Sequence, residues 1–167
     1  MKRLALLLSL VGVVGLGVAF AASAGGNSAK VVKFERMAPV VAPFTGSTMP
    51  PNPIRGINGG GVPWSIESGT GFLRADGRLH VQVEGLIIPA RGDNPVSAFR
   101  GVVNCLTPDA PMSGVNLVTD PFPATMTGDS TIDAMVDLPD TCIAPIVFVT
   151  NGTGSAPGAW FATTGTG

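Results

Sequence analysis

The sequence predicts an all-β protein, an antiparallel β-sandwich of about seven to eight strands that is immunoglobulin-like in general architecture. Glycine (23) and proline (15) are far more frequent in the 167-residue chain than in average proteins, which suits short strands and turns. Stretches of alternating apolar and polar residues recur at short spacing, and no segment keeps a helical period. Strands of this kind pack as two sheets around one core.

Residues 71–89 carry the clearest strand signal, because apolar and polar residues alternate there on both sides of an Ala-Asp-Gly turn. A three-residue loop with its glycine in the left-handed conformation pairs Leu73 with Leu79. The same register pairs Gly71 with Val81. A two-residue loop would shift the pairing by one residue and would mix the two faces of the hairpin. We therefore expect the longer loop.

Further strands are expected at short spacing in the rest of the chain. Residues 98–106 place Phe99, Val103 and Cys105 on one face. Residues 144–151 form a continuous apolar run, which is typical of a strand covered on both faces. The other segments expected to contain strands are 113–119, 122–139, with a turn at residues 128–129, and 159–165.

Residues 1–24 have the features of a signal peptide. Two basic residues open the chain, an uncharged apolar run follows, and Ala-Ser-Ala at residues 22–24 offers a small-x-small cleavage site before Gly25. An uncleaved membrane anchor is the alternative, since the apolar run is just long enough to span a bilayer. No basic stop-transfer cluster follows the run. The sequence therefore favours a secreted protein or one of the periplasm or cell envelope.

Residues 25–61 read as a flexible Pro/Gly-rich tail in front of a sandwich domain that spans residues 62–167. Four prolines between residues 43 and 53 disfavour regular strand pairing, and the three glycines at 59–61 favour a loose chain. A leader that packs along the domain is the alternative. The sequence leaves this choice open.

Cys105 and Cys142 are the only cysteines, and both lie in the part of the chain predicted to be exported. An even number of cysteines in an oxidising compartment argues for a disulfide bond. Two buried free thiols that act as small apolar side chains are the alternative. Each cysteine lies near the end of a predicted strand, so we expect a bridge to join two strand ends across the sandwich.

His80 is the only histidine in the chain, and this restricts the chemistry available to the protein. A structural zinc site needs four cysteine or histidine ligands, and a blue-copper site needs two histidines and a free cysteine. No serine stands in the Gly-x-Ser-x-Gly motif that would suggest a triad with His80. Because His80 shares one face of its strand with Gln82 and Glu84, it is expected on the solvent face. The sequence predicts no catalytic residue, no metal site and no cofactor.

Asp129, Asp133 and Asp137 recur at a spacing of four. Apolar residues alternate between them, so we expect a strand on which Asp133 and Asp137 lie too far apart for the paired carboxylates of a glycosidase. A secreted carboxylate-dependent hydrolase that uses Asp129 or Asp133 is the weaker alternative function. The loops 127–130 and 139–141 offer oxygen ligands for calcium but lack the Asp-x-Asp-x-Asp spacing of a calcium loop.

Trp64 and Trp160 stand near the two ends of the predicted domain. If they are buried, they close the ends of the core. If they are exposed, together with Phe161 they form an aromatic platform on a binding surface. A secreted carbohydrate-binding module that uses Trp64 and Trp160 is therefore a further alternative function.

The net charge of −1 offers no electrostatic case for binding to nucleic acid or to an anionic membrane surface. Membrane contact is expected only through the signal segment, if that segment stays uncleaved. The sequence identifies no ligand and no partner protein.

Five motifs resemble a group of uncharacterised small exported bacterial proteins. They are GGVPWSI, DGRLHVQVEGL, NPVSAFRGVVNCL, VDLPDTCIAPIVFVT and WFATTG, and together they span roughly residues 59–165. The resemblance implies a bacterial source, export and the pairing of Cys105 with Cys142, but no activity. Taken together, these observations favour an exported, non-enzymatic structural or binding module of the bacterial envelope or extracellular space.

Overall fold

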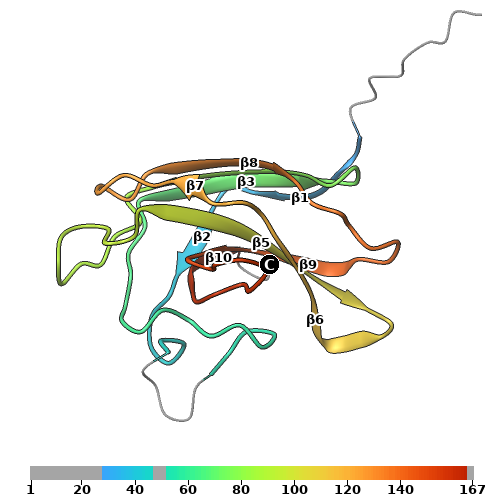
Figure 1. The fold of residues 1–167 in the computed structure, drawn as a ribbon, viewed down its shortest axis with the longest axis horizontal. Coiled ribbons are helices and arrows are strands. Elements are labelled where there is room, and N and C mark those ends of the chain that lie inside the picture. Colours follow the sequence, from blue (N-terminus) through green and yellow to red (C-terminus); the bar gives the residue numbers. More distant parts are fainter. Residues whose placement is uncertain (1–27, 47–51, 165–167) are drawn as a thin grey trace, which may run out of the picture.

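The computed structural model describes residues 28–46 and 52–164, and within them every regular element is a β-strand. Two antiparallel sheets face each other as the layers of a sandwich (Figure 1). This confirms the predicted fold class, while the immunoglobulin-like detail stays a prediction. The strands are β1 (Lys30–Phe34), β2 (Met37–Pro39), β3 (Ser68–Arg74), β4 (Arg78–Glu84), β5 (Ala98–Thr107), β6 (Ala110–Val118), β7 (Phe122–Pro123), β8 (Ser130–Met135), β9 (Ile143–Thr150) and β10 (Trp160–Thr164).

The two sheets draw on distant parts of the chain. The four-stranded sheet has the order β1-β3-β4-β8, and the six-stranded sheet has the order β2-β10-β9-β5-β6 with β7 beside β5. Strands β1 and β2 are consecutive but belong to different sheets, so the chain crosses from one layer to the other between them. Every described strand pair is antiparallel.

The β3–β4 hairpin has the register that the sequence predicts. Leu73 pairs with Leu79 and Gly71 with Val81. Gly77 closes the three-residue turn with a φ of 86°, and its amide donates to the carbonyl of Arg74. This left-handed conformation is easy for glycine and costly for other residues, so the glycine fixes the loop length and therefore the faces of the hairpin.

The core lies between the sheets. Gly101 of β5 faces the side chains of Leu79 and Ile132 from the opposite sheet, and alternation along β5 turns Phe99 and Val103 to the same side. All four of these neighbours are completely buried. Burial of whole aliphatic and aromatic side chains stabilises the fold by about 1.5–3 kcal/mol for each residue.

The prediction of a loose tail does not hold for the described part of residues 25–61. Strand β1 pairs with β3 and β2 pairs with β10. Gly69 and Gly71 of β3 lack side chains where Met37 and Phe34 pack, because a Cβ at either glycine would overlap with one of them. The alternative of a leader packed along the domain is therefore the one that the structure shows.

The proline- and glycine-rich segment after β2 covers the outer face of the six-stranded sheet. Phe44 packs against Trp160 with ring centroids 6.3 Å apart, and Ile57 is 1% exposed. The amide of Trp160 donates to the carbonyl of Asn58, and the carbonyl of Trp160 accepts from Gly60. Glycine allows such close backbone contact, which is why a composition typical of loops still gives an ordered layer here.

The predicted signal peptide, residues 1–24, lies outside the described residues. Within the described ranges no helix is long and apolar enough to cross a membrane.

Candidate functional site

His80 lies in a row of side chains on the outer face of the four-stranded sheet. The register places Phe72 of β3, His80 of β4 and Asp133 of β8 side by side. Nδ1 of His80 lies 2.6 Å from Oδ1 of Asp133, and its ring stacks on Phe72 with centroids 5.4 Å apart. The side chain of His80 is 29% exposed, as expected for the solvent face. Cross-strand pairs of this kind stabilise a sheet.

Two cations complete this row. Nζ of Lys30 lies 5.0 Å from the centroid of the Phe72 ring, and the guanidinium carbon of Arg74 lies 5.1 Å from it. A cation over an aromatic face is attracted by the quadrupole of the ring. The arrangement therefore joins β1, β3, β4 and β8 across the whole width of the sheet.

Asp129 holds a turn in place. Oδ1 of Asp129 accepts from the amide of Gly85 at 3.0 Å, and Oδ2 accepts from Oγ1 of Thr127 at 2.7 Å. The amide of Asp129 donates in turn to Oγ1 of Thr125. The hydrogen bond from Gly85, followed by that from Thr127, holds the pKa of the Asp129 carboxyl below its usual value. These bonds fasten the turn before β8 to the end of β4.

Glu84 and Asp129 line the same open hollow, which has a volume of about 460 Å³. Glu84 accepts hydrogen bonds from Ser68 and from Gln82, each at 3.0 Å. Both carboxylates thus act as acceptors within the sheet and its turn. A general acid needs a raised pKa, and the shift at Asp129 has the opposite direction.

The other predicted acidic positions are spread over the surface. Asp133 binds His80, and both Asp137 and Asp140 are exposed in the loop between β8 and β9. Within residues 28–46 and 52–164 no three His, Cys, Asp or Glu side chains come together as ligands for a metal ion.

Both tryptophans are buried, which corrects the alternative of an exposed aromatic platform. Trp64 is 3% exposed and stacks on Phe161 with ring centroids 4.0 Å apart. Trp160 is 2% exposed and packs between Phe44 and Phe148. Trp160 begins β10 and Trp64 stacks on the next residue of that strand, so both indoles are buried at the start of β10.

The predicted disulfide bond between Cys105 and Cys142 is present, but it does not cross the sandwich. Cys105 lies on β5, and Cys142 directly precedes β9, the neighbour of β5 in the same sheet. The expectation of a bridge across the layers is therefore wrong. It failed because strand order cannot be read from the sequence: β5 and β9 are far apart in the chain but adjacent in the sheet.

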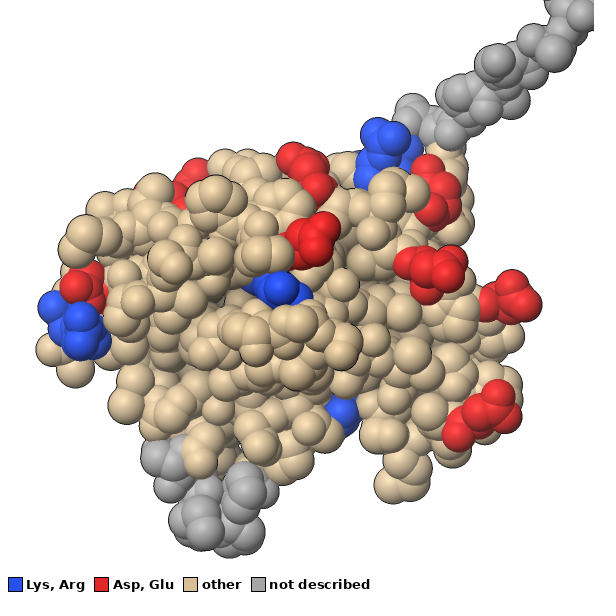
Figure 2. Space-filling model, viewed as in Figure 1, with Lys and Arg blue, Asp and Glu red and all other residues tan. Residues whose placement is uncertain are grey.

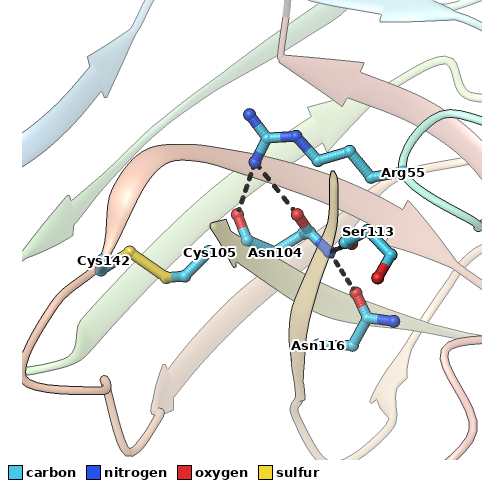
Figure 3. The surroundings of a disulfide bond; sticks show 6 residues. All are labelled: Arg55, Asn104, Cys105, Ser113, Asn116 and Cys142. Carbon is cyan, nitrogen blue, oxygen red and sulfur yellow. Dashed lines mark hydrogen bonds between the residues drawn. A yellow bond between two sulfur atoms is a disulfide. The ribbon is translucent and has the colours of Figure 1, made fainter. Parts of the chain in front are cut away.

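A polar network lies beside the disulfide bond (Figure 3). Asn104 is completely buried, and Nη1 of Arg55 donates to its side-chain oxygen at 3.0 Å. Nδ2 of Asn104 donates to the side-chain oxygen of Asn116 at 2.7 Å and to the carbonyl of Ser113 at 2.9 Å. Sequence reasoning missed this network. Its one signal was the asparagine inside the apolar run GVVNCL, since a buried amide needs partners.

Comparison of the chain with protein-family models, with curated proteins and with solved structures finds no match.

Proposed function

We propose that the protein is an exported, non-enzymatic structural or binding module of the bacterial envelope or extracellular space. The observation that carries this proposal is that the side chains best suited to catalysis are engaged in hydrogen bonds within the fold. His80 binds Asp133, and Asp129 accepts hydrogen bonds from a backbone amide and from a threonine. These side chains fasten strands and turns to one another, which is the work expected of a rigid scaffold.

The disulfide bond supports the location. Disulfides form and persist in oxidising, extracellular-type environments. The bridge between Cys105 and Cys142 has a Cα–Cα distance of 4.8 Å, within the usual range for disulfides. Together with the predicted signal peptide at residues 1–24, it supports export to the envelope or beyond.

The two alternative functions have less support. A carbohydrate-binding function would require exposed indoles, and Trp64 and Trp160 are buried. One observation favours a hydrolase, namely the hollow that Glu84 and Asp129 share. The lowered pKa of Asp129 opposes a role as general acid.

Intact mass spectrometry of the protein from culture medium and envelope fractions tests the location. We expect a denatured mass that matches a chain starting at Gly25 and that is two hydrogens lighter than the reduced form. A full-length mass in the membrane fraction alone would contradict cleavage and release.

Hydrolase assays test the second part of the proposal. The wild-type protein is expected to turn over none of a panel of glycosides and esters. Turnover that disappears in both Glu84→Gln and Asp129→Asn, with the variants still folded, would replace the proposed function with the hydrolase.

A further inference from the structure

Strand β6 forms an edge of the six-stranded sheet, and among the described residues it pairs only with β5. The β5–β6 hairpin projects from the body of the sandwich (Figure 1). The amide of Thr119 donates to the carbonyl of Gly101, so these residues form a hydrogen-bonded pair. Hydrogen-bonded and non-hydrogen-bonded pairs alternate along antiparallel strands. The backbone amides and carbonyls of Asn116 and Val118 therefore point away from β5.

The C-terminal half of this edge, residues 115–118, lacks the charged side chains that oppose strand pairing, whereas Pro111 removes one amide near the β5–β6 turn. Proteins place charged residues, especially lysine, on exposed edge strands. Strand β1, an edge of the other sheet, carries Lys30 and Lys33, whereas β6 has no charged residue. Within β6, Met112 is 85% exposed and Val115 is 40% exposed. Strand β6 is thus an open edge that carries exposed apolar side chains.

The edge is also held rigidly. The disulfide bond fixes the end of β5 next to β9. Asn104 of β5 binds Ser113 and Asn116 of β6, and Arg55 binds Asn104 from the covering segment. A strand that is already in place loses little conformational entropy when a second strand adds to it.

Carboxylates lie at both ends of β6, while Arg55 lies beside its middle through Asn104 and Asn116. An open hollow of about 420 Å³ at the β5–β6 turn is lined by Val115, Asp109 and Asp140 among others. Asp120 follows the other end of β6. Figure 2 shows acidic side chains along the side of the molecule where the β5–β6 hairpin and the β8–β9 loop lie. From residue 101 to the C-terminus the sequence has no lysine or arginine but carries Asp109, Asp120, Asp129, Asp133, Asp137 and Asp140.

We propose that β6 is the docking edge for an extended, lysine- or arginine-containing segment of another protein, which adds to the sheet as a further strand. Main-chain hydrogen bonds to Asn116 and Val118 would supply the pairing, as in other complexes formed by strand addition. A lysine or arginine stem fits the apolar side of the hollow, with its charge next to Asp109 and Asp140. This inference rests on the proposed function, because it names the contact surface of the binding module.

Charge selects this partner over a second copy that pairs through its own β6. In an antiparallel pair of β6 strands, Asp109 and Asp120 of the two copies would approach each other, and like charges across an interface are unfavourable. A cationic segment meets the same carboxylates with complementary charge.

Fluorescence anisotropy with labelled, end-capped hexapeptides tests the proposal on the oxidised, processed protein. The probes are Lys-Val-Thr-Val-Thr-Lys and its charge-reversed form Glu-Val-Thr-Val-Thr-Glu. We expect the lysine peptide to bind at least about tenfold more tightly at low salt and to weaken as salt is raised. Equal affinity for the two peptides, or no binding of either, would overturn the proposal.

Two kinds of variant locate the bound peptide. Val118→Pro removes an outward amide without removing a bond to β5 and should weaken the lysine peptide at least about tenfold, whereas Val118→Thr keeps the amide and the affinity. Neutralising Asp109, Asp120 and Asp140 to asparagine should abolish the salt dependence, and Glu84→Gln on the other sheet should preserve it. If Val118→Pro does not fold, the charge variants still test whether the peptide binds at β6.

The remaining outcomes also discriminate. Unchanged binding in Val118→Pro and in the charge variants would overturn the assignment to β6. If the wild type self-associates and Val118→Pro does not, the occupant of β6 is a second copy of the chain. This result would overturn the proposal that a segment of another protein docks there. The mass and hydrolase measurements are independent of these peptides, so a failure here is distinguishable from a failure of the proposed function.

Discussion

Nη1 of Arg55 donates to the side-chain oxygen of Asn104, a completely buried amide on β5. Arg55 has a φ of 49° and precedes Gly56, whose φ is 80°, in a two-residue turn closed by reciprocal hydrogen bonds between Ile54 and Ile57. A left-handed conformation costs a residue other than glycine roughly 1–2 kcal/mol. The contact with Asn104 offsets this cost and fastens the covering segment to the sheet.

Arg55→Ala should therefore lower the free energy of unfolding by about 1–3 kcal/mol, because the buried Asn104 oxygen loses its charged donor. Urea denaturation measures this loss. Arg91→Ala is the matched control, since Arg91 forms an exposed ion pair with Asp93 that contributes at most about 1 kcal/mol. Equal losses in the two variants would show that the Arg55 contact is not formed in solution.

Reduction of the disulfide should destabilise the protein substantially. The bridge between Cys105 and Cys142 has a sequence separation of 37, and the chain-entropy model gives about 4 kcal/mol for a loop of that length. For a domain of this size the loss corresponds to a drop in Tm of roughly 10 °C. Calorimetry with and without reductant measures the drop, and Cys105→Ala with Cys142→Ala should reproduce it. An unchanged Tm in both experiments would contradict the prediction.

Tryptophan fluorescence reports directly on the core. Since Trp64 and Trp160 are 3% and 2% exposed, the native emission should be blue-shifted and resistant to iodide quenching. Trp160→Phe leaves Trp64 as the only indole and should give the same result. Strong quenching of either protein in the native state would return the tryptophans to the surface and revive the carbohydrate-binding alternative.

Gly71→Ala should lower the free energy of unfolding by roughly 1–3 kcal/mol, as overpacking does in other cores. A Cβ at Gly71 would collide with the backbone oxygen of His80 and with the ring of Phe34, the residue that packs β1 onto β3. Gly61→Ala is the control, since a Cβ there meets nothing within 4 Å. Chemical denaturation compares the two. Equal stabilities would mean that His80 and Phe34 do not lie against Gly71 as described.

Asp129→Asn should cost about 1 kcal/mol at neutral pH, because the amide replaces the carboxylate that accepts from Gly85 and Thr127. The pKa of Asp129 is lowered in the folded state, so its contribution is present above the ordinary value of 3.8 and is lost as pH falls through the lower folded value. The difference between wild type and variant should therefore shrink in strong acid.

Urea titrations at several pH values measure this convergence for Asp129→Asn. The exposed Asp137 provides the control, and Asp137→Asn should leave stability nearly unchanged at each pH. A difference between wild type and Asp129→Asn that stays constant down to strong acid would show that the charge of the carboxylate is not involved.

The local pattern of the sequence was sufficient for the strands after residue 62 and for one hairpin, but not for β1 and β2, which lie in the segment predicted to be a flexible tail. Alternation around the Ala-Asp-Gly turn predicted the pairing of Leu73 with Leu79, because side-chain period and turn geometry are properties of neighbouring residues. The placement of His80 on the solvent face follows from the same alternation. Local patterns extend over a few residues, and these features depend on nothing further away.

The sequence by itself determined the fold class and the β3–β4 register, since both follow from local periodicity and composition, and its two cysteines predicted the disulfide bond. Only the tertiary structure decided that Cys105 and Cys142 join neighbours in one sheet, that Arg55 reaches Asn104, and that a proline- and glycine-rich segment forms a packed layer. These contacts join residues far apart in the chain. Their free energy depends on strand order and on the shape of the buried surface, and neither is encoded in a short stretch of sequence.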